Sequence, residues 1–167
     1  MDTCMSIPFS IRRATSADSE AIMRVHLASI HTLCAADYTP AQIVAWTARF
    51  KVEGYARAMD KGMEVMFVAD MNGETVGFSS LGGHEVRAVY VDPQLTRRGI
   101  ASALLTEVEG EARDRGIATI RLDSSLTAYL FYRAKGYAES GRGTHDLGNG
   151  VSIPCVHMHK ELTLTHA

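Results

Sequence analysis

The chain has 167 residues, of which 46% are hydrophobic and 22% charged, and its net charge is −2. This length and balance fit one globular domain over residues 1–167 with a sizeable core. The small net charge gives no reason to expect nucleic acid or an anionic membrane as a partner, and no apolar run reaches the ~18 residues that a membrane span needs.

The N-terminus and the cysteines favour a cytoplasmic location. The first residues lack the basic start and apolar core of a signal peptide. The three cysteines, at positions 4, 34 and 155, form neither an even disulfide framework nor a metal-spaced pair. We therefore expect reduced thiols.

The first part of the chain predicts one strand and three helices. Residues 9–14 favour a strand, and Thr15 with Asp18 forms a capping-box start for a helix over 17–35. Thr39 is placed to cap a second helix with Pro40 at its first position. Residues 54–61 predict a short third helix.

The remaining pattern predicts a mixed α/β fold. Strands over 63–70, 75–81 and 84–91 form an antiparallel meander, whose first turn is the type I′ signal Asn72-Gly73. A helix over 98–115 follows, with Glu109 and Glu111 in i,i+4 pairs on its solvent face. The next strand, 118–123, should run parallel to 86–91. A helix over 126–135, a strand over 137–142, a polar glycine-rich turn over 141–150 and a strand over 151–162 complete the chain.

The join between the 86–91 strand and its helix has a chemical use. It reads Arg97-Arg98-Gly99-Ile100-Ala101. A helix start offers unpaired N–H groups and a positive dipole end, glycine admits a bulky anion, and arginine suits phosphate. These features predict a pyrophosphate cradle, with a plain basic strand-to-helix turn as the alternative. The P-loop and dinucleotide fingerprints are missing.

Two segments resemble motifs of the GNAT N-acetyltransferase superfamily. Residues 89–93 and 97–105 are similar to its acetyl-CoA motif, Q/R-x-x-G-x-G/A: Gly99 and Ala101 match the last two fixed positions, whereas Thr96 replaces the usual Gln or Arg. Residues 131–137, FYRAKGY, are similar to its late F/L-Y-x-x-x-G-F/Y segment. The resemblance covers roughly residues 9–160. It implies the acyl-CoA N-acyltransferase fold, with antiparallel N-terminal strands and a splayed parallel pair at the centre.

The resemblance also implies how the cosubstrate acetyl-CoA is held, without a metal. Pantetheine would lie between the splayed strands, and the pyrophosphate would sit on the amides that follow the first strand. The implied cofactor-binding residues are Val89, Tyr90, Val91, Arg97, Arg98, Gly99, Ile100, Ala101 and Ser102.

Catalysis in the family needs a base for the amine and an acid for the leaving thiolate. The resemblance implies Tyr132 as the acid; the alternative is that Tyr132 packs with Phe131 against the sheet. The resemblance implies Glu85 as the base, because it lies on the strand that carries catalytic carboxylates in many members of the family. Its neighbour His84 is the other candidate, and adjacent strand residues face opposite ways, so at most one of the two points into the site. The alternative to a base on the protein is that a chain of water molecules, or the substrate itself, takes the proton from the amine.

The acceptor site is expected near the first helices. His31, Cys34, Tyr38 and Trp46 are its candidate residues, although Tyr38 and Trp46 would also serve to pack one helix on another. His157 and His159 share a strand face, but without a third ligand they predict no zinc site.

These interpretations predict transfer of acetyl from acetyl-CoA to a primary amine, carried by a small molecule or a peptide. A homodimer through the C-terminal strands is common in the family. Two alternatives remain: an acyl-CoA sensor or interaction module of the same fold without turnover, and an α/β nucleotide-binding protein.

Overall fold

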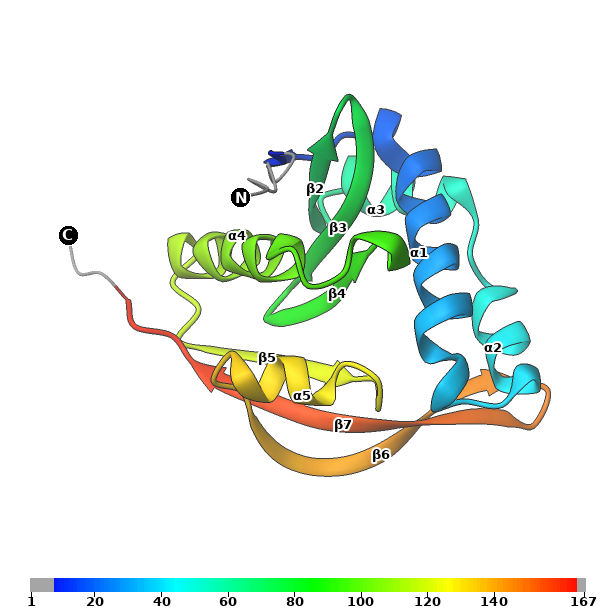
Figure 1. Cartoon of the computed structure of the whole chain (residues 1–167). Helices are drawn as coiled ribbons and strands as arrows, with labels where there is room; N and C mark the ends of the chain where they lie inside the picture. Colours follow the sequence, from blue (N-terminus) through cyan, green and yellow to red (C-terminus); the bar gives the residue numbers. More distant parts are fainter. Residues whose placement is uncertain (1–7, 165–167) are drawn as a thin grey trace, which may run out of the picture.

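The structure, a computed structural model, describes residues 8–164 and contains a seven-stranded mixed sheet (Figure 1). The strand order is β1-β2-β3-β4-β5-β7-β6. The strands are β1 Ser10–Arg13, β2 Val65–Met71, β3 Glu74–Gly82, β4 Glu85–Val91, β5 Thr119–Ser124, β6 Ala138–Gly148 and β7 Val151–Glu161. The α-helices are α1 Ser19–Leu33, α2 Pro40–Thr47, α3 Val52–Asp60, α4 Ile100–Asp114 and α5 Tyr129–Ala134. No helix within the described range is long and apolar enough to cross a membrane.

Only β4 and β5 pair in parallel, and they separate soon after they start. Their one paired position is Glu85 with Arg121, next to the bond from the Arg121 amide to the His84 carbonyl at 3.0 Å. On its other edge β4 stays paired with β3 as far as Val91, opposite Gly77. The predicted splayed pair at the centre of the sheet is therefore confirmed.

Helices cover both faces of the sheet (Figure 1). Alternate residues of β2 face opposite ways, so Phe67 joins the core under α4, whereas Met66 and Val68 join the core under α1 and α3. The helix α4 contributes Leu104 and Val108, both fully buried, to the first core. This arrangement fixes α4, and with it the predicted cradle, against the central strands.

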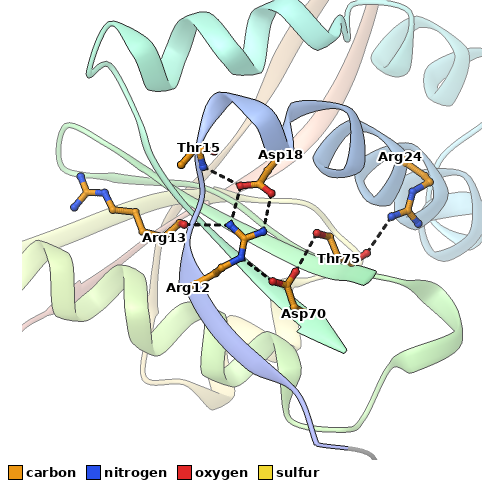
Figure 2. A network of polar contacts seen from close by, with 7 residues as sticks. All are labelled: Arg12, Arg13, Thr15, Asp18, Arg24, Asp70 and Thr75. Atoms are coloured by element: carbon orange, nitrogen blue, oxygen red, sulfur yellow. Dashed lines mark hydrogen bonds and ion pairs between the residues drawn. The ribbon is translucent and has the colours of Figure 1, made fainter. Parts of the chain in front are cut away.

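A polar network ties the start of the chain to the β2–β3 hairpin (Figure 2). The Arg12 guanidinium donates to Asp18 at 2.7 and 2.9 Å and to Asp70 at 2.7 Å. The Asp18 carboxylate also accepts from the Thr15 amide at 2.9 Å, which confirms the capping box ahead of α1. These bonds lower the pKa of Asp18, mainly through Arg12. The Asp70 carboxylate accepts in turn from the Thr75 hydroxyl at 3.1 Å.

Most predicted elements are confirmed, with two changes near the C-terminus. The helix α5 begins at Tyr129, after a turn in which the Leu126 amide donates to the Tyr38 hydroxyl at 2.9 Å and the Ala128 amide to the Ser125 hydroxyl at 3.1 Å. The predicted turn over 141–150 is wrong: β6 pairs with β7 as far as Gly148. The turn is confined to 149–150, where both residues have positive φ. An exposed outer strand needs no apolar face, which explains why its composition resembled a loop.

The predicted i,i+4 pair of Glu109 with Arg113 is present at 3.6 Å, but the predicted place of Glu109 on the solvent face is wrong. This carboxylate does not lie on the solvent face of α4 but is 7% exposed. It accepts from the Tyr137 hydroxyl and the Lys160 ammonium, both at 3.0 Å. Lys160 on β7 and Tyr137 beside β6 keep this buried charge paired. Helix spacing cannot reveal such long-range partners.

Candidate active site

The first helical turn of α4 presents the predicted anion cradle. Gly99 caps the helix with φ 81°, and Arg97 also has a positive φ, 62°. The first amide bonded to a backbone carbonyl in this turn is that of Ala103, which donates to Gly99 at 3.0 Å. The three preceding amides, of residues 100–102, have no protein partner within the described chain, as expected for a helix start. They are free to bind an anion.

A cavity of about 500 Å³ opens beside this turn. All the residues predicted to bind the cofactor line it except Arg98. Its wall is completed from α1 and from the segment that leads into α5. The lining residues are Ser29, Leu33, Cys34, Val89, Tyr90, Val91, Leu95, Thr96, Arg97, Gly99, Ile100, Ala101, Ser102, Ser125, Thr127, Ala128 and Phe131.

A second cavity, of about 680 Å³, is lined from α1, α2 and the strands β4, β5, β6 and β7. Tyr90 and Ser125 line both cavities, so the two meet where β4 and β5 separate. Of the predicted acceptor residues, Tyr38 and Trp46 line this second cavity, and their rings also pack edge to face at 5.4 Å. Cys34 lines the first cavity instead, and His31 is exposed and lines neither. The second cavity is hereafter called the acceptor cavity.

Carboxylates face the acceptor cavity from three parts of the chain. Glu64 precedes β2 and accepts a short hydrogen bond from the Ser80 hydroxyl. Asp123 lies at the end of β5, and Asp146 lies on β6. Arg49 and Arg87 also line the cavity, so its wall is mixed in charge rather than uniformly acidic. Glu64 was not among the predicted site residues, because its only signal is that of a polar residue at the start of an apolar strand.

An aromatic cluster forms the floor of the acceptor cavity around His26. The imidazole stacks on Phe50 with ring centroids 4.1 Å apart and lies 4.3 Å from the Tyr90 ring. Its Nδ1 shares a hydrogen bond of 2.8 Å with the Tyr55 hydroxyl. Burial lowers the pKa of His26 to about 3, so the ring is neutral near pH 7. Tyr90, which lines both cavities, is thereby packed against the neutral His26 ring.

Tyr132, the predicted acid, lies behind the wall of the first cavity and does not line it. Its ring packs edge to face with Phe131 at 5.2 Å and with Tyr137 at 5.6 Å. The Tyr132 ring therefore packs with Phe131, as the alternative to a catalytic role predicted. Burial raises the pKa of the hydroxyl above its usual value, which keeps the phenol protonated. Within the described residues the Tyr132 hydroxyl has no hydrogen-bond partner. It differs from the Ser19 hydroxyl, whose oxygen is both unpaired and fully buried, because it keeps some contact with solvent.

Glu85, the predicted base, lines neither cavity. Its side chain is 39% exposed, and its carboxylate lies 3.8 Å from the Arg87 guanidinium. His84 lies in a shallow depression beside Gly116, also away from both cavities. The predicted cofactor residues thus come together, whereas the predicted base stands apart from them.

Comparison with known proteins gives this arrangement a family. A family profile described as "Acetyltransferase (GNAT) domain" matches residues 34–162, most of the chain. The chain belongs to the GNAT family of acetyltransferases.

Relatives and solved structures agree with this assignment to the GNAT family. An uncharacterized N-acetyltransferase of Escherichia coli K12, YafP, is 30% identical over 128 residues, which cover 76% of this chain and 79% of that protein. A GCN5-related N-acetyltransferase of Rhodopseudomonas palustris superposes with a TM-score of 0.86 and 29% identity, over 97% of this chain and 100% of that one. PaiA N-acetyltransferase of Thermoplasma acidophilum, solved with coenzyme A, gives 0.76 and 21%, over 92% and 99%.

Proposed function

We propose that this GNAT protein transfers the acetyl group of acetyl-CoA to a primary amine on a small molecule or a peptide. One observation carries the proposal: a cavity with an anion cradle at one end meets a second, carboxylate-bearing cavity at Tyr90 and Ser125. Two substrates entering from opposite sides would therefore meet between the separated strands β4 and β5.

The residues of the first cavity fit acetyl-CoA. The free amides of residues 100–102, the helix dipole and the Arg97 guanidinium suit its pyrophosphate. Beyond Glu85, the edge of β4 that faces β5 has no strand partner among the described residues, so its peptide groups near Val89 and Val91 are available to the pantetheine amides. Coenzyme A in the PaiA relative supports the same cosubstrate here.

The reaction needs little from the protein besides positioning and two proton transfers. The amine nitrogen attacks the thioester carbonyl, a C–N bond forms and the C–S bond breaks. The amine proton passes to a base and the thiolate takes a proton. The protonated Tyr132 phenol is our candidate acid. Among the candidate bases, Glu64 is better placed than Glu85 because only Glu64 lines the acceptor cavity.

Calorimetric titration with acetyl-CoA, CoA and ATP in parallel tests the proposal. We expect micromolar acetyl-CoA binding, no comparable binding of ATP, and turnover with at least one member of a panel of small and peptide amines. Arg97→Glu should weaken acetyl-CoA binding by about tenfold or more, because one good charge-assisted contact is replaced by repulsion. Arg98→Glu is the matched control, since Arg98 has the same charge but lies outside the cavity.

Three outcomes would contradict this function. Preferential binding of ATP would favour a nucleotide-binding protein. Equal losses of acetyl-CoA affinity in Arg97→Glu and Arg98→Glu would contradict a specific contact of Arg97 with the pyrophosphate. Tight acetyl-CoA binding without turnover on any amine would favour a sensor or interaction module of the same fold.

A further inference from the structure

One face of three neighbouring strands, beside the acceptor cavity, gathers four side chains that the proposed function does not use together. Asp123 on β5 lies directly opposite His157 on β7. Cys155 precedes His157 by two residues and therefore faces the same way. His145 comes from β6, opposite Ile153, one step further along the same face.

The polar atoms of this cluster converge. The Asp123 carboxylate bridges the two histidines: Oδ1 lies 2.5 Å from Nδ1 of His157, and Oδ2 lies 3.2 Å from Nε2 of His145. The ligand atoms of Asp123, Cys155 and His157 all lie within 4.8 Å of one another. His159, with which His157 shares a strand face, lies one step away opposite Arg121.

We propose that Asp123, His145, Cys155 and His157 form a binding site for a thiophilic divalent transition-metal ion such as Zn²⁺. Carboxylate oxygen, imidazole nitrogen and thiolate sulfur are the ligands that this ion takes, and a thiolate disfavours Mg²⁺ and Ca²⁺. One carboxylate and one thiolate with two neutral imidazoles balance a charge of 2+. Asp123, His145 and Cys155 also line the acceptor cavity, but metal binding by them does not require acetyl transfer. A metal site here would depart from the expectation that the chain binds no metal.

Asp123, Cys155 and His157 need only a small opening to admit the ion, whereas His145 lies outside the group whose ligand atoms are within 4.8 Å of one another and would turn toward it. Ligand atoms at about 2.0–2.3 Å from a tetrahedral Zn²⁺ lie roughly 3.3–3.7 Å from one another. Asp123 and His157 would therefore separate by about 1 Å. The two histidine side chains are 50% and 46% exposed, so both rings have room to move.

Glycine and a buried thiol give the cluster the shape of a site. A Cβ on Gly143, opposite Cys155, would lie 2.6 Å from Nε2 of His157, so glycine alone lets this ring lie over β6. Cys155 is 3% exposed and forms the floor, beneath the more exposed Asp123 and histidines. The alternative is an ordinary surface cluster in which two histidines share one carboxylate. That cluster would explain the contacts of Asp123 with His145 and His157, but it would not explain the thiol of Cys155 beneath them.

The test is a Co²⁺ and Zn²⁺ titration of the full-length protein after treatment with a chelator. We expect one equivalent of Co²⁺ to give the visible bands of tetrahedral cobalt and a thiolate-to-cobalt charge-transfer band. Cys155→Ser should remove the charge-transfer band and weaken Zn²⁺ binding, measured against a chromophoric chelator, by about tenfold or more. His145→Gln, which changes an exposed side chain, should weaken Zn²⁺ similarly while leaving the metal-free circular dichroism spectrum unchanged.

Matched controls distinguish this site from adventitious binding. The Cys4→Ser/Cys34→Ser double variant keeps Cys155 as the only thiol of the chain and should retain the charge-transfer band. His159→Gln should retain Zn²⁺ affinity within about twofold. The proposal is overturned by binding of less than one equivalent, by a band that survives Cys155→Ser, or by a loss of Zn²⁺ affinity in His159→Gln that equals the loss in His145→Gln.

Discussion

The hydroxyl of Tyr132 is the proposed proton donor to the leaving thiolate. Tyr132 is 6% exposed, and burial raises the pKa of its hydroxyl. If this phenol protonates the leaving thiolate, Tyr132→Phe should lower kcat by about 100-fold, the lower end of what general acids contribute. Acetyl-CoA affinity should change by less than about threefold, because the ring and its packing remain. Steady-state kinetics and calorimetry on the same preparation measure both quantities.

Tyr129→Phe is the control for this prediction. Tyr129 lies on the same helix, but its hydroxyl is directed to Glu139, at 3.1 Å, on the outside of the molecule. We expect kcat of this variant to stay within about twofold of the wild-type value, because surface changes usually have small effects. A Tyr132→Phe enzyme as active as Tyr129→Phe would assign Tyr132 to the core alone.

The choice of base can be decided between two glutamates. Glu64 lines the acceptor cavity, whereas Glu85 lies outside it beside Arg87. Glu64→Gln preserves the shape and the bond from Ser80 but removes the proton acceptor, so we expect kcat to fall by about 100-fold. Glu85→Gln should leave kcat within about threefold. The opposite ranking, measured with the same amine at saturating acetyl-CoA, would restore Glu85 as the base.

Local sequence predicted one half of this site better than the other. The cradle is a contiguous segment, and its residues must come together because one strand leads directly into one helix. The acceptor cavity is instead assembled from α1, α2, β4, β5, β6, β7 and the segments between elements, whose side chains meet only through the tertiary fold. Glu64 and Asp123 carry no local signal that distinguishes them from ordinary surface carboxylates.

At the level of elements, the contact between α4 and β3 positions the cradle. A Cβ on Gly77 would lie 2.9 Å from Leu104 Cδ1 and 3.1 Å from the Tyr90 carbonyl. Gly77→Ala should therefore push α4 away from the sheet and lower the free energy of unfolding by about 1–3 kcal/mol, as overpacked cores do. Because Tyr90 and the first turn of α4 both line the first cavity, where acetyl-CoA is proposed to bind, acetyl-CoA affinity should fall as well.

Gly110 provides a matched control within α4. It lies inside the helix, and an added Cβ there meets nothing within 4 Å. Gly110→Ala should raise the free energy of unfolding by about 0.5–1 kcal/mol, the difference in helix propensity, and leave acetyl-CoA affinity unchanged. Urea unfolding of both variants measures the contrast. Equal stability of Gly77→Ala and wild type would mean that α4 adapts without cost.

The elements that the sequence predicted well are those with strong local rules. Asn72-Gly73 adopts positive φ at both residues, and Thr39 caps α2 by accepting from the Gln42 amide at 3.2 Å. The later part of the chain follows long-range rules instead. The start of α5 depends on the Tyr38 hydroxyl, which comes from a distant part of the sequence, and β6 is a strand because β7 pairs with it.

In the whole molecule, a sparsely bonded seam divides the sheet between β4 and β5. The strands β1–β4 form one antiparallel group and β5–β7 another, and Glu85 with Arg121 is their one paired position. Side chains rather than ladder bonds connect the two groups across the opening. The connection runs through α1, which packs on β3 and β4 with Ile22 and Val25. The segment that follows α1 is tied to the other group, because the Tyr38 hydroxyl donates to the Pro154 carbonyl at 3.0 Å on β7 and accepts from the Leu126 amide. The seam that weakens the sheet is also the place where the two cavities meet.

The stability of the whole chain should depend on pH through His26. Its pKa is lowered to about 3 by burial, whereas an unfolded histidine has a pKa of about 6.5. Below pH 6.5 the unfolded chain therefore binds a proton that the folded chain does not. This contribution to stability is complete above pH 6.5 and is lost progressively as the pH falls toward 3, by at most about 1.4 kcal/mol per pH unit.

Urea unfolding between pH 7.5 and 5 measures this dependence. His26→Gln keeps a partner for the Tyr55 hydroxyl but cannot titrate. Unfolding of the variant therefore takes up nearly one proton fewer than unfolding of the wild type near pH 5, and its free energy of unfolding should decline less steeply between pH 6.5 and 5. The variant is less stable at every pH because the stack on Phe50 is lost, and for this reason the slope and not the absolute value decides. His31→Gln, an exposed change on the same helix, should keep the wild-type slope. Identical slopes in wild type and His26→Gln would mean that the buried ring accepts a proton without unfolding, and that the aromatic floor of the acceptor cavity opens to water.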